Sequence, residues 1–341
     1  MKALIYKGNE KLEVVEVPKP TPKDGELLLK IKACGICGSD VHGWLGLTER
    51  RIPPVVMGHE FTAEIEGFGK GCTSGLALGE LVAVQPCMSC GICEYCRKGN
   101  NNNCPSRRYL GGMDCNGAFQ EYLCVPEKYA YKLPDSISPR IGTLIEVFSV
   151  SQSAVKKAGS LSGKNVVIIG GGTVGLMALI AAKLQKPNKI LLTELSPMRL
   201  EIAKKLGADV AISPLNNDLI TEVKSAFNGE LADVSIESVG LDITAKQSLE
   251  ILKPQGCSIW IGLSDKMVEM DMQRIVDKEL KILGSYAFTH DEFGESIDLI
   301  QKHALDLDMF ISNEVTLSEA EDMFKALAED AEKYLKCIVI F

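Results

Sequence analysis

The stretch Val166–Leu184, "VVIIGGGTVGLMALIAAKL", decides the fold of the second half of the chain. A short apolar run typical of a buried strand ends at Gly170, and a pattern typical of a helix follows Gly172. Glycines at this G-x-G-x-x-G spacing, between a strand and a helix, are typical of a dinucleotide-binding turn. Gly170 permits the tight turn, Gly172 lets a pyrophosphate approach the backbone, and Gly175 lets helix and strand pack closely.

Residues around the turn indicate which cofactor it would bind. Thr173 and Val174 lie at the N-terminus of the helix, where free N–H groups attract phosphates. The next strand, "KILLTE", ends at Glu194, whose carboxylate can hydrogen-bond the ribose hydroxyls and would repel the additional phosphate of NADP. The pattern therefore favours NAD, and Arg199 keeps NADP open as an alternative. A tight turn without any ligand is the competing interpretation.

The chain shows two different sequence patterns, one before and one after Lys164. From Lys164 onward, short apolar runs such as "DVSIES" and "CSIWIG" alternate with helical stretches, which is typical of a parallel sheet covered on both faces. The first part of the chain contains short apolar runs bounded by Gly and Pro, and these runs predict strands. We therefore expect an α/β protein with a β-rich first domain and a doubly wound second domain. The terminal run "KCIVIF" is expected to return to the first domain.

Composition excludes several classes of function. The 341 residues are 46% hydrophobic and 24% charged, as in ordinary globular proteins. A net charge of −8 without a basic run opposes a nucleic-acid partner. No apolar run reaches the roughly 18 residues of a membrane helix, and "MKALIYKGNE" does not resemble a signal peptide. We expect a cytoplasmic protein that binds neither nucleic acid nor membrane.

The chain has 12 cysteines, and several of them are clustered. In a chain of this length without an export signal, clustered cysteines indicate metal rather than disulfides. The stretch "CMSCGICEYCRKGNNNNC", residues 87–104, holds five, whereas a tetrahedral site takes four. The spacing alone does not select four of them. It also leaves open an iron–sulfur cluster or a non-catalytic regulatory module.

A sparser group of possible metal ligands precedes this cluster. Cysteine, histidine and carboxylate are the ligand types of zinc sites. Each residue alone is more typical of a packed thiol or a surface imidazole. Their combination with the nucleotide turn favours a metal-dependent oxidoreductase. The group comprises Cys37, Ser39, Asp40 and His42 in "CGSDVH", and His59 and Glu60 in "GHE".

The motifs "GICGSDVH", "GHE", the cysteine lobe, "YKLPD" and "GGGTVG" occur in the order typical of one family. Over nearly its whole length the chain resembles zinc-dependent medium-chain dehydrogenases, the family of alcohol, sorbitol and threonine dehydrogenases. It is most similar to polyol and sugar-alcohol-phosphate dehydrogenases. The resemblance implies a GroES-like catalytic domain over residues 1–147 and 286–341, and a Rossmann NAD-binding domain over residues 148–285.

The resemblance also implies roles for individual residues. A catalytic zinc would be held by Cys37, His59 and Glu60, with Glu146 at the fourth position. Asp40 would orient the zinc-binding histidine, and Ser39 and His42 would relay a proton to solvent. A structural zinc would be held by Cys90, Cys93, Cys96 and Cys104, which leaves Cys87 as a packed thiol. Ser285 and Tyr286 would line the substrate pocket.

The implied reaction is hydride transfer from a secondary alcohol of a polyol or sugar alcohol, possibly phosphorylated, to NAD, with a ketone as product. Two zinc ions per chain and a homotetramer or homodimer are implied as well. A threonine or sugar-acid dehydrogenase on the same scaffold is one alternative. A metal-binding regulatory protein without catalysis is an alternative from another class.

Overall fold

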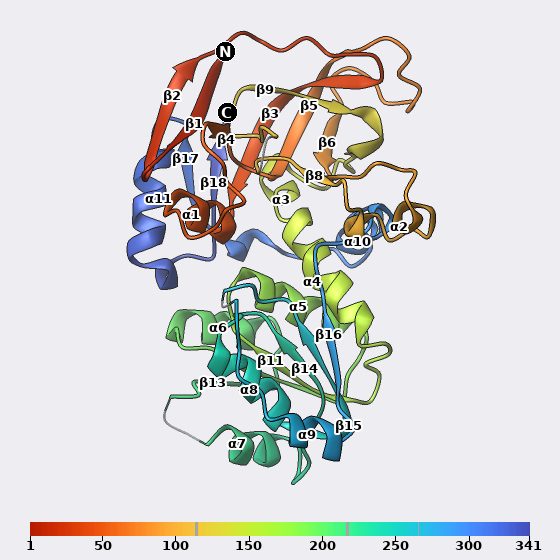
Figure 1. Cartoon of the computed structure of the whole chain (residues 1–341), viewed down its shortest axis with the longest axis vertical. Helices are drawn as coiled ribbons and strands as arrows, with labels where there is room; N and C mark the ends of the chain where they lie inside the picture. The colour runs from red at the N-terminus through yellow and green to blue at the C-terminus, as the bar shows by residue number, and fades with distance from the viewer. Residues whose placement is uncertain (113–114, 216–217, 265) are drawn as a thin grey trace. The chain divides into compact units, whose positions relative to one another are not determined.

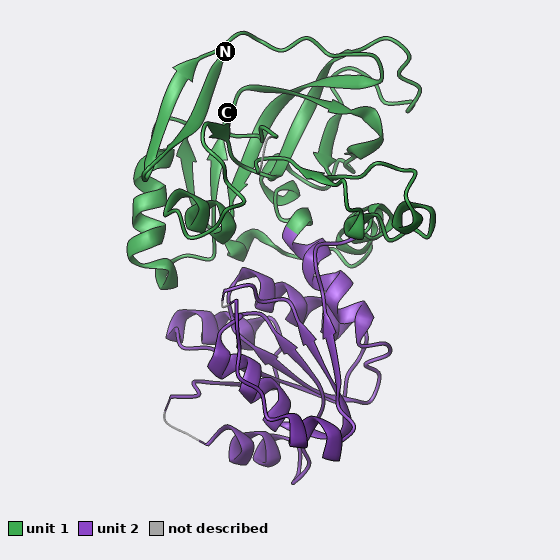
Figure 2. Cartoon of the chain, in the orientation of Figure 1, with its two compact units in different colours: residues 1–146, 289–341 green, residues 147–288 purple. Residues whose placement is uncertain are grey.

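The computed structural model describes residues 1–112, 115–215, 218–264 and 266–341 (Figure 1). The chain forms two compact units, the first from residues 1–146 and 289–341 and the second from residues 147–288 (Figure 2). The expected boundaries fell at 147/148 and 285/286, one residue later and three residues earlier than these. No helix in the described part of the chain is long and apolar enough to cross a membrane.

The second unit is built on a six-stranded sheet in which every neighbouring pair is parallel. Its order is β13-β12-β11-β14-β15-β16, the doubly wound order of dinucleotide-binding folds. The central strands are covered on both faces, which explains their continuous apolar runs. The strands are β11 (Asn165–Ile169), β12 (Lys189–Thr193), β13 (Val210–Ile212), β14 (Ala232–Glu237), β15 (Leu252–Trp260) and β16 (Lys281–Gly284).

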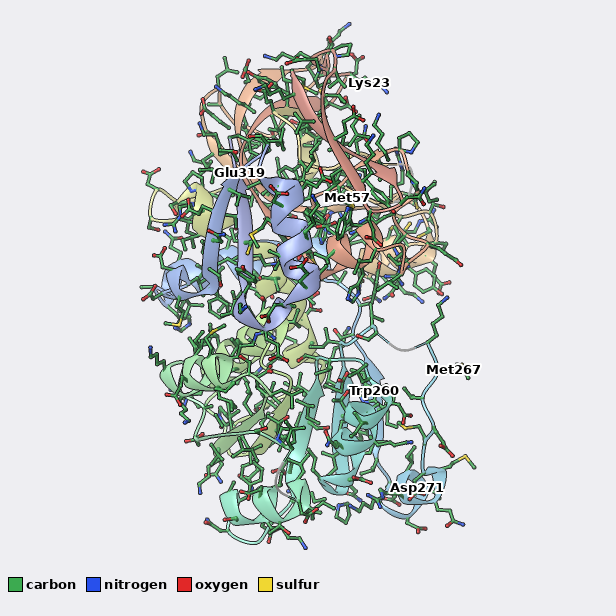
Figure 3. All side chains as sticks on the ribbon, turned by 90° about the vertical axis from the view of Figure 1, so that its left-hand side faces the viewer. Lys23, Met57, Trp260, Met267, Asp271 and Glu319 are labelled. Atoms are coloured by element: carbon green, nitrogen blue, oxygen red, sulfur yellow. The ribbon has the colours of Figure 1, made fainter. Side chains whose placement is uncertain are left out.

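Helices connect these strands and supply part of the core. Val223 and Leu249 pack in one apolar cluster with Val167 at the centre of the sheet. By contrast, Met267 projects outward from a loop of this unit (Figure 3). The helices are α4 (Ile145–Lys157), which begins in the first unit, α5 (Thr173–Leu184), α6 (Pro197–Lys205), α7 (Leu219–Ala226), α8 (Asp242–Glu250) and α9 (Met272–Asp277).

The first unit is β-rich, as expected. A seven-stranded sheet has the order β10-β6-β5-β3-β18-β17, with β9 also paired to β3, and a smaller sheet has the order β2-β1-β4. The strands are β1 (Lys2–Gly8), β2 (Lys11–Glu16), β3 (Glu26–Ile36), β4 (Val55–Val56), β5 (Glu60–Phe68), β6 (Leu81–Val84), β7 (Cys87–Met88), β8 (Arg108–Tyr109), β9 (Tyr122–Pro126), β10 (Ala130–Lys132), β17 (Ile311–Thr316) and β18 (Lys336–Ile340).

The terminal strand β18 pairs antiparallel with β3, and Cys337 lies opposite Ile36, which confirms its predicted return to the first domain. Met57 lies fully buried in the core of this unit (Figure 3), just before the segment that carries His59. The helices are α1 (Gly38–Trp44), α2 (Glu94–Arg97), α3 (Pro139–Gly142), α10 (His290–Lys302) and α11 (Ala320–Glu329), with 3₁₀ turns η1 (Asn101–Asn103), η2 (Glu127–Tyr129), η3 (Asp308–Phe310) and η4 (Ala331–Lys333).

The glycine turn has the geometry that its spacing predicts. Gly170 has a φ of +98°, in the left-handed region that favours glycine. A Cβ on Gly175 would overlap the carbonyl oxygen of Gly170, so the helix can approach the strand only without a side chain there. Gly172 is the N-cap residue of α5, and a Cβ there would meet nothing within 4 Å.

The substitution Gly175→Ala is expected to destabilise the second unit, because the added methyl must push backbone atoms apart. Overpacking of this kind costs about 1–3 kcal/mol or more. Gly172→Ala is the matched control, since its methyl has open space, and it should leave the unfolding free energy close to that of the wild type. Chemical denaturation measures both, and equal losses for the two variants would contradict the packing role of Gly175.

Candidate metal centre

The residues Cys37, His59 and Glu60 form a compact group in the first unit. One ligand atom from each lies within 4.8 Å of the others, and His59 and Glu60 are buried. Cys37 follows β3, His59 precedes β5, and Glu60 is the first residue of β5, the antiparallel neighbour of β3. Gly35 lies opposite Glu60 in this pairing, and a Cβ on it would overlap the carboxylate. Adjacent strand ends therefore bring the three ligand types together.

Asp40 lies directly behind this group and is completely buried. Its Oδ2 accepts a hydrogen bond from the backbone N–H of Cys37 at 3.2 Å, and its Oδ1 lies 3.5 Å from Nδ1 of His59. With Nδ1 facing a carboxylate, Nε2 is the ring nitrogen left for a metal. Asp40 therefore contacts both Cys37 and His59, and the orienting role that the resemblance implies for it stays a prediction.

Arg51 is a buried residue that the sequence reasoning missed. Its Nε and Nη2 donate to Oδ1 of Asp40 at 3.2 and 3.0 Å, and Nη2 also donates to Oγ of Ser39 at 3.1 Å. Burial alone would raise the pKa of Asp40, but His59 and Arg51 hold that pKa well below its usual range. A Cβ on Gly43 would overlap the Arg51 side chain, so the fold leaves room for this guanidinium.

Lys336 is the second missed residue. Its Nζ lies 2.8 and 2.6 Å from the two carboxylate oxygens of Glu60, and both side chains are buried. Burial lowers the pKa of Lys336, but the Glu60 charge outweighs it and raises that pKa above its usual range. Lys336 belongs to β18, 276 residues away from Glu60 in sequence. The terminal strand therefore supplies the counter-charge of a candidate ligand.

Glu146, near the start of α4, is buried but does not belong to the group of ligand atoms within 4.8 Å. Its Oε1 accepts a hydrogen bond from the hydroxyl of Tyr109 at 2.8 Å. Burial raises the pKa of Glu146 to about 7, against the opposing effects of His59 and of the Tyr109 hydrogen bond. The Tyr109 ring also packs edge-on to His59, with centroids 5.4 Å apart. Tyr109 is the third residue that sequence reasoning missed.

The residues predicted for the proton relay lie in the first unit, and those predicted for the substrate pocket lie in the second. Ser39 and His42 are exposed on α1 in the first unit. Ser285 and Tyr286 follow β16 in the second unit, at the carboxyl edge of its sheet, where ligands of this fold class bind. Ser285 is buried, and its Oγ has no hydrogen-bond partner in the described part of the chain.

Four cysteines form a second group whose ligand atoms lie within 4.8 Å of one another, namely Cys90, Cys93, Cys96 and Cys104. The Sγ atom of Cys96 lies 3.4 Å from that of Cys93 and 3.9 Å from that of Cys90. Four thiolates at about 2.3 Å from a tetrahedral zinc would be about 3.8 Å apart, which is close to these two separations. Cys87 is buried in β7 outside the group.

The residues predicted to bind the cofactor come together around the glycine turn. Thr173 and Val174 open α5, with Gly172 as its N-cap. The Oε2 atom of Glu194 accepts a hydrogen bond from the backbone N–H of Gly171 at 2.7 Å and lies 3.9 Å from Nη1 of Arg199. The carboxylate thus lies at the turn, beside a guanidinium that balances its charge.

Comparisons with known proteins agree with this geometry. Residues 23–135 match the alcohol dehydrogenase GroES-like domain, and residues 173–302 match the zinc-binding dehydrogenase domain. The chain is 31% identical to sorbitol dehydrogenase of Bacillus subtilis, over 99% of this chain and 97% of the relative. It is 35% identical to L-threonine 3-dehydrogenase of Pyrococcus horikoshii, over 88% and 87%. Galactitol-1-phosphate dehydrogenase from Escherichia coli superposes with a TM-score of 0.93 at 25% identity, over 100% of both chains.

The substitution Arg51→Met is expected to destabilise the protein strongly, because it removes the buried guanidinium that donates twice to the buried carboxylate of Asp40. Breaking a buried ion pair in this way costs about 3–5 kcal/mol. Arg50→Met changes the exposed neighbour and serves as the control. Chemical denaturation measures the two variants, and an Arg51→Met protein as stable as Arg50→Met would contradict the role given to Arg51.

The substitution Glu146→Gln is expected to change how stability depends on pH in metal-free protein. The pKa of Glu146 rises from 4.5 to about 7 on folding, so its contribution is complete below pH 4.5 and is lost as pH rises through 7. The wild type should therefore lose stability relative to Glu146→Gln between about pH 5 and pH 8. Unfolding free energies of chelator-treated protein test this, and parallel curves for the two proteins would refute it.

Proposed function

Because the chain belongs to the zinc-dependent medium-chain dehydrogenase family, we propose that it oxidises a secondary alcohol of a polyol or sugar alcohol to a ketone, with NAD as hydride acceptor. The observation that carries this proposal is the group formed by Cys37, His59 and Glu60, with Asp40 directly behind it. In this reaction the alcohol would lose a hydride, for which NAD would be the acceptor, and a hydroxyl proton, which would leave to solvent.

We assign the catalytic zinc to Cys37, His59, Glu60 and Glu146. The donor set fits, because thiolate, imidazole and carboxylate are all zinc ligands. When bound, zinc would supply Lewis acidity that lowers the pKa of a nearby hydroxyl, as NAD would supply the hydride acceptor. Asp40 keeps His59 in the tautomer that leaves Nε2 free.

The two carboxylates in this assignment each have a competing donor. Lys336 binds both oxygens of Glu60, and Tyr109 binds one oxygen of Glu146. Lys336 and Tyr109 thus hold the two carboxylates in place, and each carboxylate would share its oxygens between its donor and a bound zinc.

Ser39 and His42 are assigned to the proton path. Both are exposed on the short helix α1, which begins immediately after Cys37. Arg51 donates a hydrogen bond to Oγ of Ser39, which occupies one lone pair and leaves the hydroxyl proton for donation. Ser39 can thus exchange its proton with a substrate hydroxyl, and His42 can pass the proton to solvent.

The cofactor turn is assigned to NAD rather than NADP. Gly170, Gly172 and Gly175 shape the turn, and Thr173 and Val174 place backbone N–H groups at the start of α5 for the pyrophosphate. The ribose hydroxyls of NAD would donate hydrogen bonds to the carboxylate of Glu194. Arg199 lies 3.9 Å from that carboxylate and balances its charge. If the cofactor were NADP, the same guanidinium could contact the additional phosphate.

The four-cysteine lobe is assigned to a structural zinc. Four thiolates close a tetrahedral coordination shell and leave no position for a substrate. No disulfide bond forms in the described part of the chain, which is consistent with a reducing compartment such as the cytoplasm. We also propose a homodimer or homotetramer, since β16 is an edge strand and Leu283 on it is exposed.

The substrate class rests on similarity to enzymes named for sorbitol and galactitol-1-phosphate. Ser285 and Tyr286 are assigned to the pocket, where a buried serine hydroxyl without a partner suits a hydroxyl-rich substrate. L-threonine is the second candidate, because the threonine dehydrogenase of Pyrococcus horikoshii shares 35% identity with this chain. Threonine differs from a polyol in its charged groups.

The expected outcome of a substrate screen is reduction of NAD with a polyol or polyol phosphate, and little reduction of NADP. The screen measures absorbance of the reduced cofactor with polyols, polyol phosphates, sugar acids and threonine. Turnover confined to threonine would replace the polyol assignment. Absence of turnover with every substrate and both cofactors would contradict the proposed function.

The matched controls for this screen are two Cys→Ser variants. Cys37→Ser removes a candidate zinc ligand and should abolish turnover without unfolding the protein. Cys72→Ser changes a half-buried thiol of the same unit whose Sγ donates to the backbone oxygen of Glu26 at 3.3 Å, and it should stay active. Normal turnover in Cys37→Ser would refute the site assignment.

A further inference from the structure

The four-cysteine lobe is closed at its base by the short ladder between β7 and β8. Cys87 pairs with Tyr109 and Met88 pairs with Arg108, so both ends of the lobe meet in this ladder. The backbone N–H of Leu110 donates to the oxygen of Pro86 at 3.0 Å and extends the ladder by one step. Tyr109 therefore occupies a fixed position at the point where the chain leaves the lobe.

The side chain of Tyr109 contacts two residues of the proposed catalytic zinc site. Its hydroxyl donates to Oε1 of Glu146 at 2.8 Å, and its ring packs edge-on to His59 with an interplanar angle of 66°. A phenol that meets one ligand through its hydroxyl and another through its ring restricts both side chains. This arrangement does more than fill space, since the hydrogen bond is directional.

The backbone between Cys104 and Tyr109 is short and is held by hydrogen bonds. The oxygen of Cys104 accepts the backbone N–H of Arg107 at 3.1 Å and also Nη1 of the same arginine at 3.1 Å. Cys104 is completely buried, and its Sγ accepts the backbone N–H of Cys90 at 3.4 Å. The position of Cys104 in the lobe thus determines where β8 begins.

We propose that Tyr109 is a positioning residue for the catalytic metal site and that the four-cysteine lobe acts on that site through it. The inference rests on the proposed function, because it concerns the site assigned there. A zinc with four thiolate ligands would have no free coordination position at which a substrate could bind. A metal held by Cys90, Cys93, Cys96 and Cys104 would fix the loop from which Tyr109 reaches Glu146 and His59.

The first test measures zinc affinity, with a chromophoric chelator as competitor, in the full-length protein. Tyr109→Phe keeps the ring and removes only the hydroxyl, so it is expected to weaken the more weakly held zinc roughly 10-fold, the effect typical of removing a residue that supports a ligand. Tyr95→Phe is the matched control, because Tyr95 lies in the same lobe with 45% of its surface exposed. Its affinities should equal those of the wild type.

The second test measures coupling between the lobe and Tyr109. Pro105→Gly keeps all four thiols and loosens the backbone between Cys104 and Tyr109. It should weaken the same zinc in the wild-type background and add no further loss in the Tyr109→Phe background, because both changes remove one connection. Cys96→Ser, which takes away a lobe ligand, should show the same non-additivity where that variant folds.

Each outcome decides between distinct conclusions. If the wild type holds two zinc ions and Tyr109→Phe binds both with normal affinity, the inference is overturned and the proposed function stands. If Tyr109→Phe and Tyr95→Phe weaken zinc equally, or if the losses in the double variant are additive, the connection through Tyr109 is refuted. A wild type that holds zinc only on its four cysteines overturns both the inference and the proposed function.

Discussion

The buried carboxylate of Asp40 is the constraint around which the candidate centre is organised. A charge without solvent requires partners, since an unpaired buried charge costs several kcal/mol. Cys37 supplies a backbone N–H, His59 faces it through Nδ1, and Arg51 donates to it twice. The same contacts that satisfy Asp40 set the start of α1, the orientation of the imidazole and the direction of the Arg51 side chain. Satisfying one acid therefore assembles most of the centre.

Two further carboxylates extend this pattern to distant parts of the first unit. Glu60 is satisfied by Lys336 from the terminal strand, and Glu146 by Tyr109 from the base of the cysteine lobe. Both donors arrive only when β18 has paired with β3 and β8 has paired with β7. The geometry of the centre consequently depends on segments that contribute no ligand of their own. We infer from this dependence that the lobe and the terminal strand contribute to the proposed function.

The sequence predicts the parts of this arrangement that have local signatures. Glycine spacing predicts the turn at Gly170, strand and helix alternation predicts the parallel sheet, and clustered cysteines predict a metal site. The choice of four among the five cysteines came from the family resemblance. Arg51, Lys336 and Tyr109 were not predicted, because a single arginine, lysine or tyrosine has no pattern. Their roles arise from tertiary contacts, between Arg51 and Asp40 11 residues apart, Tyr109 and Glu146 37 residues apart, and Lys336 and Glu60 276 residues apart. Glu146 was predicted from resemblance, but its hydrogen bond to Tyr109 follows only from the three-dimensional arrangement.

The proposed catalysis requires a metal ion at Cys37, His59 and Glu60, and not only at the four cysteines of the lobe. Anomalous diffraction from a crystal of the protein as purified, recorded on both sides of the zinc absorption edge, locates each zinc ion. The account predicts two peaks per chain, one among Cys90, Cys93, Cys96 and Cys104 and one beside Cys37 and His59. A single peak on the four cysteines, in protein that retains full activity, would contradict it.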